Sequence, residues 1–290
     1  MDATTALSSL TDQPVLDPLA EPLSKAIRAG YESAGPAGQQ AKNALHGVWL
    51  KHPLHPVFTD LPLGAWTTGL VLDAIAARTH DRATAEAADV AIAVGLAGAA
   101  GAAVTGLTDW SETSGRARRT GLIHGLLNIA ATTLYATAFV MRRRGARAAG
   151  QSCAIAGYTV AAGAAWLGGD LVYNQRVGVT HAVVDGPDTF TPVANASDVP
   201  EGAMRRIRHD NLDLLLVRQY GQLCALAHSC SHLGGPLSKG TLNEGSVVCP
   251  WHGSEFAIVD GRVINGPATH DQPCLDVRER YGRIEVKQRG

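Results

Sequence analysis

Three long stretches without a charged side chain constrain the fold of this chain more than any other feature. They cover residues 90–108, 120–141 and 148–169. An α-helix rises about 1.5 Å per residue, so about 20 residues cross the ~30 Å hydrocarbon layer of a bilayer. A fourth stretch, 58–77, is interrupted by Asp60, Pro62 and Asp73. We therefore predict a four-helix transmembrane bundle within residues 51–177.

The apolar stretches are rich in small residues, as in Gly95-Leu-Ala-Gly98. Small side chains let helices approach closely in lipid, where water does not drive them together. The alternative is a soluble bundle of Ala-rich buried helices, because Ala and Gly are only weakly apolar on insertion scales. Three uncharged runs in succession favour the membrane. Residues 1–50 are polar, and Leu19, Leu23 and Ile27 recur there with helical spacing, which indicates one short amphipathic helix at a surface or interface.

A four-span topology makes this a multi-pass protein of the cytoplasmic (inner) membrane with both termini on one side. The basic residues near the spans are equally divided, Lys42, Lys51, Arg116, Arg118, Arg119 and Arg176 against Arg78, Arg82, Arg142, Arg143, Arg144 and Arg147. The positive-inside rule therefore gives no orientation. The N-terminal sequence shows no export signal, which favours a cytoplasmic C-terminal domain. An internal export signal at Arg142-Arg-Arg144 is the alternative.

Polar residues gather at the ends of the expected spans that share one membrane face, the face from which the C-terminal domain emerges. They are His55, Asp60, Asp109, His124, Asn128 and Asp170. Ionisable groups at membrane depth are costly and usually functional. The two histidines can ligate a b-type haem, with the acids orienting the other ring nitrogens. The cluster can instead form a quinone or proton site, or simply cap helix ends and pair internally.

From about residue 180 the pattern changes to short β-type runs separated by turns. The runs are 212–218, 246–248, 255–258 and 283–287, with turn signals at Asp260-Gly261 and Asn265-Gly266. These features predict a small antiparallel all-β domain over residues 180–290. The expected fold is therefore an N-terminal α-helical bundle followed by a C-terminal β domain.

Two cysteine–histidine pairs are set into this domain, in Cys230-Ser-His232-Leu-Gly-Gly and Cys249-Pro-Trp-His252-Gly. Two loops of this kind can hold a [2Fe–2S] cluster, with two thiolates on one iron and two neutral imidazoles on the other. Two Cys and two His also suit a tetrahedral zinc ion, and spacing alone leaves both sites open. Glycines 234, 235 and 253 permit the tight loop backbones that either site needs.

Both motifs resemble those of Rieske [2Fe–2S] proteins, and Gly266-Pro-Ala268 is similar to the third, proline-bearing loop of that family. The resemblance covers roughly residues 185–290. It implies that Cys230, His232, Cys249 and His252 hold a Rieske-type [2Fe–2S] cluster. It also implies one-electron transfer as the basic function.

Departures from the family pattern predict a ferredoxin-like midpoint potential. Gly235 and Trp251 occupy the positions at which Rieske subunits of quinol–cytochrome complexes carry a loop disulfide. Phe256 stands where such proteins place a tyrosine hydroxyl on a cysteine sulfur, although Ser254 keeps one potential donor. Fewer hydrogen bonds to sulfur stabilise the reduced cluster less. We expect a midpoint in the lower half of the Rieske range of about −150 to +300 mV.

The helical region resembles an uncharacterised family of four-helix bacterial membrane domains. The resemblance rests on His52-Pro-Leu-His-Pro56, His124-Gly-Leu-Leu-Asn128 and Gly168-Gly-Asp-Leu-Val-Tyr173, and it implies no activity. The near-neutral charge and the absence of a basic stripe predict no nucleic-acid partner.

Three functions fit these features. The first is a membrane-anchored carrier that passes single electrons to or from a redox partner protein. The second is a quinol- or haem-linked oxidoreductase that uses the His/Asp face, and the third is a redox sensor. Only 38 residues follow His252, so we expect electron transfer and not a complete oxygenase. Membrane lipid is an expected partner, and dimerisation through Gly/Ala faces stays open.

Overall fold

The computed structural model describes residues 11–289, which divide into two compact units. One unit contains the chain up to Gly35 together with Leu54–Val177, and the other contains Pro36–Pro53 together with Gly178–Gly290. The chain therefore crosses between the units after residues 35, 53 and 177. Two crossings lie close to the boundaries expected from sequence, at 51 and 180. The grouping of Pro36–Pro53 with the β unit has no counterpart in the sequence pattern.

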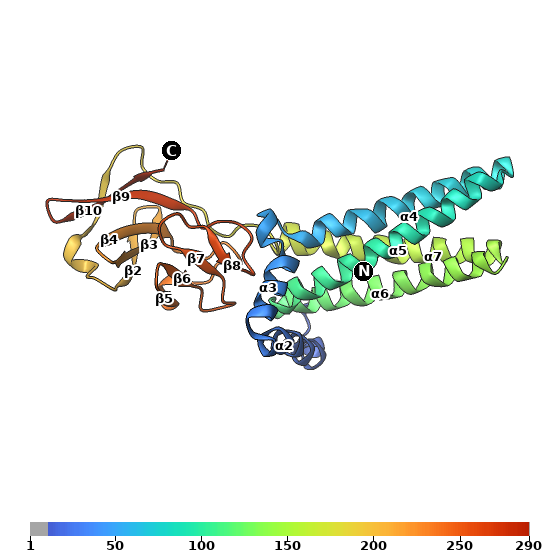
Figure 1. Ribbon diagram of the computed structural model, residues 1–290, viewed down its shortest axis with the longest axis horizontal. Helices are drawn as coiled ribbons and strands as arrows, with labels where there is room; N and C mark the ends of the chain where they lie inside the picture. The colour runs from blue at the N-terminus through green and yellow to red at the C-terminus, as the bar shows by residue number, and fades with distance from the viewer. Residues whose placement is uncertain (1–10, 290) are drawn as a thin grey trace. The chain divides into compact units, whose positions relative to one another are not determined.

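Four long helices run side by side in the helical unit (Figure 1). The α-helices of the described residues are α2 (Asp17–Ser33), α3 (Gly35–His46), α4 (Leu54–Thr79), α5 (Arg82–Ser111), α6 (Gly115–Arg143) and α7 (Arg147–Gly169). Short 3₁₀ turns precede α2 (η1, Pro14–Leu16) and follow α3 (η2, Val48–Leu50), and a π-helical turn follows α7 (η3, Asp170–Asn174). Each of the four expected spans lies within one of the helices α4–α7.

The helices pack as two hairpins, α4 with α5 and α6 with α7. Glycines on α5 receive large side chains from α4: a Cβ at Gly101 would lie 2.5 Å from the Phe58 ring, and Gly95 lies directly against Trp66. The Trp66 ring in turn stacks on Tyr135 of α6 at a centroid distance of 4.0 Å. Glycine at these positions is therefore what lets the helix backbones approach each other.

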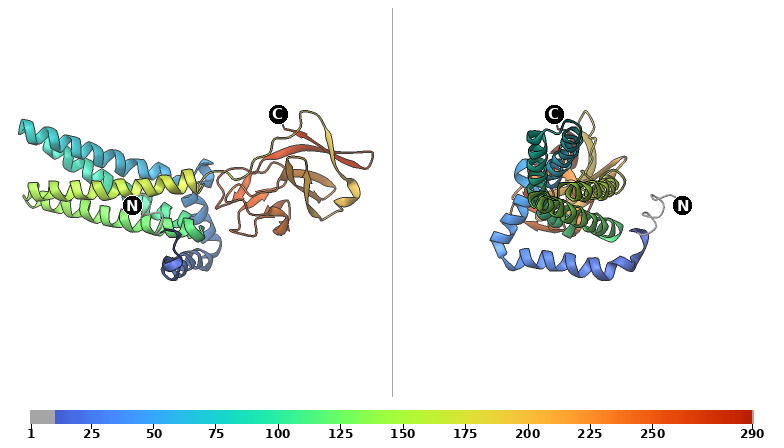
Figure 2. Two further views of the ribbon diagram at one scale, coloured as in Figure 1. Left: turned by 180° about the vertical axis from the view of Figure 1, so that it is seen from behind. Right: turned by 90° about the vertical axis from the view of Figure 1, so that its right-hand side faces the viewer.

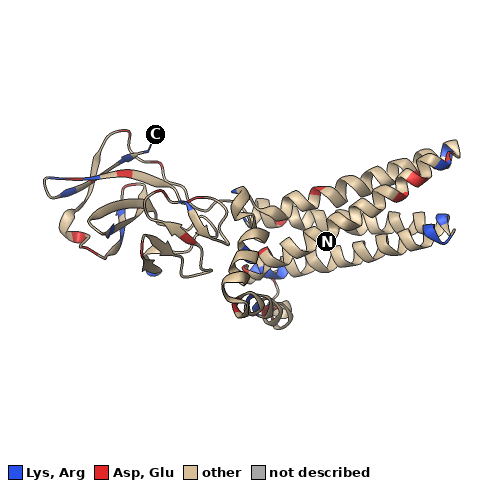
Figure 3. Ribbon diagram, viewed as in Figure 1, with Lys and Arg blue, Asp and Glu red and all other residues tan. Residues whose placement is uncertain are grey.

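The outer surface of the bundle carries many large apolar side chains. Val90, Ile129 and Ile155 are 63%, 65% and 59% exposed, and many of the buried positions are alanines and glycines. Two helices, α5 and α6, are long and apolar enough to cross a membrane, and only 28% and 17% of their apolar windows are buried. Charged residues of the four helices gather toward the two ends, as Figure 3 shows. The core helix of a soluble protein is mostly buried, unlike the apolar windows of α5 and α6.

A buried ion-pair network ties the four helices together at one end. Arg142 of α6 is paired with Asp73 of α4 and lies 3.1 Å from Asp89 of α5. Arg147 of α7 lies 2.7 Å from Asp89, and Gln151 donates to Asp73 at 3.3 Å. Removing one partner of a buried pair typically costs about 3–5 kcal/mol. Asp73, which interrupts the apolar pattern of the first span, therefore stabilises the packing of the four helices.

The helix α2 lies in the segment where we expected an amphipathic helix, and of the expected stripe only Ile27 packs on the bundle core. Ala20 and Ser24 are fully buried, and Ala20 packs against Trp110 and Leu122 of the bundle. Leu19 and Leu23 are 62% and 44% exposed. The helix crosses the end of the bundle (Figure 2), and it presents these leucines outward.

The β unit consists of two antiparallel sheets. The larger sheet has the order β1-β10-β9-β4-β3-β2 and the smaller one the order β5-β6-β7-β8. The strands are β1 (Thr191–Asn195), β2 (Met204–His209), β3 (Leu212–Gln219), β4 (Gln222–Ala227), β5 (Thr241–Asn243), β6 (Ser246–Val248), β7 (Glu255–Ala257), β8 (Val263–Asn265), β9 (Cys274–Arg280) and β10 (Arg283–Gln288). The small sheet is an insertion between β4 and β9, and its loops carry the Cys/His motifs.

The position of β3 between two hydrophobic cores explains why its sequence is apolar without alternation. Leu215 and Val217 enter the core that the large sheet shares with the small one, which also contains Phe256. Leu214 and Leu216 enter a second core on the other face of the same sheet. All four are fully buried, because both faces of this strand are covered.

Candidate metal centre

The two Cys/His loops have the same backbone conformation. The first joins β4 to β5 and the second joins β6 to β7. In each loop the cysteine N–H donates to the carbonyl five residues ahead, Cys230 to Gly235 and Cys249 to Ser254, both at 2.8 Å. In each loop a glycine four residues ahead donates back to the cysteine carbonyl, and Gly234 and Gly253 both have φ near +75°. The glycines predicted to allow tight loops thus meet a left-handed backbone requirement.

The four candidate ligands converge in two pairs. The thiols of Cys230 and Cys249 hydrogen-bond to each other. The rings of His232 and His252 lie 5.1 Å apart, centroid to centroid, and are mutually perpendicular. The Nδ1 atom of His232 is buried without a hydrogen-bond partner, a costly state for a polar atom unless it binds a metal.

This arrangement is compatible with a two-iron cluster. Among residues 11–289, no set of three or more His, Cys, Asp or Glu side chains is arranged to hold one metal ion. A sulfur pair and a nitrogen pair instead supply two donors to each of two irons. The residues present therefore fit a [2Fe–2S] group.

Backbone N–H groups are directed at both sulfurs. Those of His232 and Leu233 donate to Cys230, and those of Trp251 and His252 donate to Cys249. The pKa of Cys249 is lowered to about 7, mainly because the Cys230 thiol donates to it and also because of these backbone donors. The shared proton in turn raises the pKa of Cys230. These contacts therefore favour the thiolate, the form that binds metal, at Cys249.

Position 235 of the first ligand loop has no room for a side chain, because the Cys249 sulfur of the second loop lies against it. A Cβ at this position would lie 2.7 Å from Cys249 Sγ and 3.2 Å from the Trp251 ring. Its φ is not in the left-handed region, so the backbone itself would accept alanine. The requirement for glycine here is steric and comes from the other ligand loop.

Comparison with known proteins identifies both units. Residues 189–276 match the family described as Rieske [2Fe-2S] domain, and residues 51–181 match one described as predicted membrane protein (DUF2231). Ferredoxin CarAc of Metapseudomonas resinovorans is 32% identical over 95 residues, which are 32% of this chain and 89% of that protein. The chain belongs to the Rieske [2Fe–2S] family. A DUF2231 domain precedes the Rieske domain in it.

Other relatives also match little more than a third of this chain. Human apoptosis-inducing factor 3 is 41% identical over 115 residues, which are 39% of this chain. The chain spans only 19% of the length of that relative. A solved complex of reduced oxygenase and oxidized ferredoxin in carbazole 1,9a-dioxygenase contains a chain with 27% identity and a TM-score of 0.34. The match covers 36% of this chain and 98% of that one.

A buried glutamine fixes the first loop of the Rieske domain. The Gln272 side chain is 1% exposed and donates to the carbonyls of Ala227 and Ser229, both at 2.7 Å. Its carbonyl oxygen accepts the Ser231 N–H at 2.9 Å. Sequence reasoning missed this residue, because a single glutamine far from the motif carries no recognisable signal.

The third loop of the Rieske domain is bound to the second ligand loop through Ser254. The Ser254 hydroxyl accepts the Ala268 N–H at 3.0 Å, which leaves its own proton free to donate. Phe256 is fully buried in the same core as Cys230 and Cys249. An apolar ring with no hydrogen-bond donor therefore occupies position 256, as the sequence indicated.

Two further histidines and a lysine surround His232. The pKa of His232 lies well below its usual value, mainly because of burial and also because of the nearby His252, His46, His181 and Lys42. A neutral imidazole is the form that ligates metal. Neither His46 nor His181 has motif spacing to the ligands, so the sequence offered no signal for them.

The candidate residues of the bundle are only partly brought together. His55 and His124 lie edge to face with a centroid distance of 6.3 Å. Their Nδ1 atoms contact the carbonyls of Ala102 and Ala164 at 3.0 and 2.8 Å. Because a carbonyl only accepts, both Nδ1 atoms carry the proton. The Nε2 atom of His124 then accepts from Asn128 at 3.1 Å.

The three acidic candidates of the bundle lie in different environments. Asp109 is half-buried and lies close enough to His55 for an electrostatic interaction. Asp170 accepts from the side chains of Asn174 and Gln175 at 2.7 and 2.6 Å, at the π-helical turn that follows α7. Asp60 is exposed on α4, because five residues rotate a helix position about 140° away from His55.

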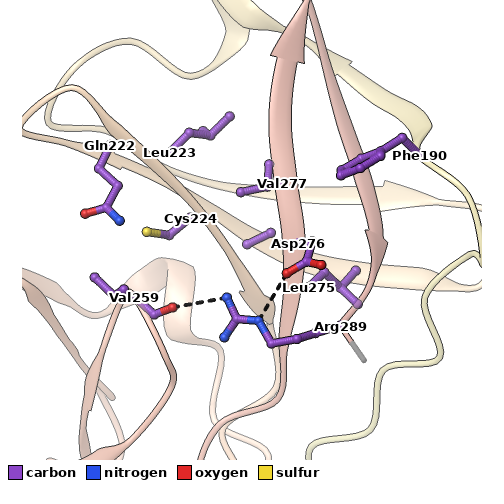
Figure 4. Close-up of a pocket in the computed structure, with 10 residues that line it drawn as sticks. Phe190, Gln222, Leu223, Cys224, Val259, Leu275, Asp276, Val277 and Arg289 are labelled. Carbon is purple, nitrogen blue, oxygen red and sulfur yellow. Dashed lines mark hydrogen bonds and ion pairs between the residues drawn. The ribbon is translucent and has the colours of Figure 1, made fainter.

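A cavity elsewhere in the Rieske domain contains none of the four candidate ligands. Figure 4 shows Arg289 among the lining residues, and it donates to Asp276 at 3.3 Å and to the Val259 carbonyl at 3.4 Å. Cys224 lines the cavity, and Cys274 lies nearby. Burial raises the pKa of both thiols, that of Cys274 to about 12, so both behave as small neutral groups.

Proposed function

We propose that this chain is a membrane-anchored one-electron carrier whose [2Fe–2S] cluster is held by Cys230, His232, Cys249 and His252. The observation that carries the proposal is the pair of matching loops, which place two thiols and two imidazoles together and leave His232 Nδ1 buried without a partner. When bound, a Rieske cluster takes up and releases one electron at a time.

The surrounding residues prepare the site for this role. Backbone N–H groups of both loops stabilise negative charge on the sulfurs, and burial keeps His232 neutral. The apolar Phe256 contributes no donor, which supports a midpoint in the lower half of the Rieske range. A soluble or membrane-bound redox protein is the proposed partner, since ferredoxins are among the relatives.

Iron and sulfide analysis with EPR of the purified full-length protein tests this assignment. We expect equal iron and acid-labile sulfide, and loss of both in His232→Ala and Cys249→Ser. His209→Ala and Cys274→Ser are matched controls outside the four ligands and should keep the cluster. Stoichiometric zinc without sulfide would establish the tetrahedral alternative and reject the proposal.

The membrane anchor is supported by the exposed apolar surface of the helices. Ile129 lies at the centre of α6 and is 65% exposed. A lysine at the centre of a spanning helix costs about 2.5–3.5 kcal/mol, whereas at an exposed site in water it costs almost nothing. We expect Ile129→Lys to reduce the amount of protein in carbonate-washed membranes, and Ser114→Lys, at the exposed end of α6, to have no effect. Wild-type yield for both variants would show that α6 faces water.

A second candidate function is a quinol or proton site at His55 and His124. The fixed Nδ1 proton leaves the Nε2 atom of His55 as an acceptor, which suits a proton received from quinol. This use is favoured over haem ligation, because the rings contact each other edge to face and Asn128 already occupies the Nε2 atom of His124.

A reduced-minus-oxidised optical spectrum distinguishes the bundle functions. A haem Soret and α-band would make the bundle a second redox centre. Quinol-dependent cluster reduction that disappears in His124→Ala would establish the quinol site. Neither signal would leave the bundle as an anchor.

A further inference from the structure

The segment Pro36–Pro53 is separated from the Rieske domain by the whole helical bundle in sequence, yet it packs with that domain. The Asn43 side chain of α3 links it to the end of β8 and the loop that follows. Its carbonyl oxygen accepts the Gly266 N–H at 2.9 Å, and its amide donates to the Asn265 side chain at 2.9 Å. Both contacts are made at the start of the proline-bearing loop.

Apolar and charged contacts fix the same segment. Val48 packs on the core that contains both ligand cysteines. A Cβ at Gly266 would lie 3.0 Å from Val48 Cγ2 and 3.4 Å from His46 Cδ2, so no space is left between segment and loop. Lys51 adds an ion pair with Asp271 at 2.7 Å.

These contacts continue to the second ligand loop. Asn265 donates to Glu255 at 2.7 Å, and Glu255 accepts from Ser246 at 2.5 Å. Beyond Gly266, the Ala268 N–H is bound to Ser254, which closes the loop of Cys249. A displacement at Asn43 therefore reaches the cluster loop through two hydrogen-bonded routes.

We propose that Pro36–Pro53 is a fixed cover of the cluster site and that Asn43 is a positioning residue for its proline loop. The inference rests on the proposed function, since it assumes the cluster at the four ligands. The position of the loop at Gly266 thus depends on α3, which precedes the four long helices in the sequence. The cover holds the proline loop against the second ligand loop and keeps water from that side of the site.

Its loss has two measurable consequences. A loosened loop opens more often, so a chelator removes iron faster, by about tenfold for the loss of two partly buried hydrogen bonds. Water that enters raises the local dielectric and favours the reduced form, which carries one more negative charge. The midpoint potential therefore moves upward, a change that a general loss of stability would not produce.

The test uses full-length wild type, Asn43→Ala and Val48→Ala, with Asn211→Ala in an exposed hairpin turn as matched control. Cluster bleaching by an iron chelator and the midpoint potential are recorded for each. Faster bleaching and a higher midpoint in the first two variants, with wild-type values in the control, support the cover.

Wild-type bleaching rates and midpoints in both Asn43→Ala and Val48→Ala would overturn it. Should Asn43→Ala acquire no cluster, Val48→Ala decides alone by the same readouts. A wild-type protein without a [2Fe–2S] spectrum would reject the proposed function itself, which separates the two failures.

Discussion

Replacing Gly235 by alanine tests whether the two loops hold a cluster between them. The added Cβ would stand 2.7 Å from Cys249 Sγ, where ordinary contact begins at 3.4 Å, so one of the atoms must move by about 0.7 Å. In the empty protein the thiol can rotate away. A sulfur bound to iron cannot, so the strain falls on the loaded form.

Overpacking of this kind costs about 1–3 kcal/mol, which corresponds to about 5- to 150-fold weaker retention of the cluster. The assay is the visible absorption per protein after anaerobic incubation with a chelator, checked by iron content. Gly163→Ala is the matched control, because a Cβ there meets nothing within 4 Å. Full retention and an unchanged spectrum in Gly235→Ala would show that the Cys249 sulfur is not held in place, and would refute the reasoning.

Three further predictions follow from the same geometry. Phe256→Tyr adds a donor beside the cysteines, and we expect redox titration to show a midpoint higher by roughly 40–60 mV, whereas an unchanged value would place the hydroxyl away from sulfur. Gln272→Ala leaves two carbonyls and the Ser231 N–H without partners, and thermal unfolding should show a loss of about 2–4 kcal/mol. Hydrogen bonds from Arg206 lower the pKa of Asp213, so this carboxylate stabilises the fold above its usual pKa, and the benefit is lost as pH falls through the lowered folded value. Unfolding midpoints of wild type and Asp213→Asn should therefore differ most at neutral pH and converge below about pH 4, and a pH-independent difference would contradict this assignment.

The sequence by itself predicted the four long helices, four of the ten strands that the described residues form, and the four candidate ligands. Within a bilayer, uncharged stretches of this length would allow hardly any conformation but a helix, because each backbone group would have to be bonded within its own segment. The Cys/His motifs are similarly local, since each loop is closed by hydrogen bonds within six residues. Patterns of this range are visible in a single sequence.

Tertiary structure decided everything that depends on distant residues. Asn43 and Gln272 bind distant loops through two and three side-chain hydrogen bonds, and isolated polar residues of this kind leave no periodic pattern in the sequence. The helix α3 reads as polar and featureless, because the face that it turns to the Rieske domain is made of amides and a histidine and has no apolar stripe. The burial of Asp73 likewise became interpretable only when the fold brought Arg142 to it from another helix. Long-range polar pairing is specified by geometry, and geometry arises only when the chain has folded.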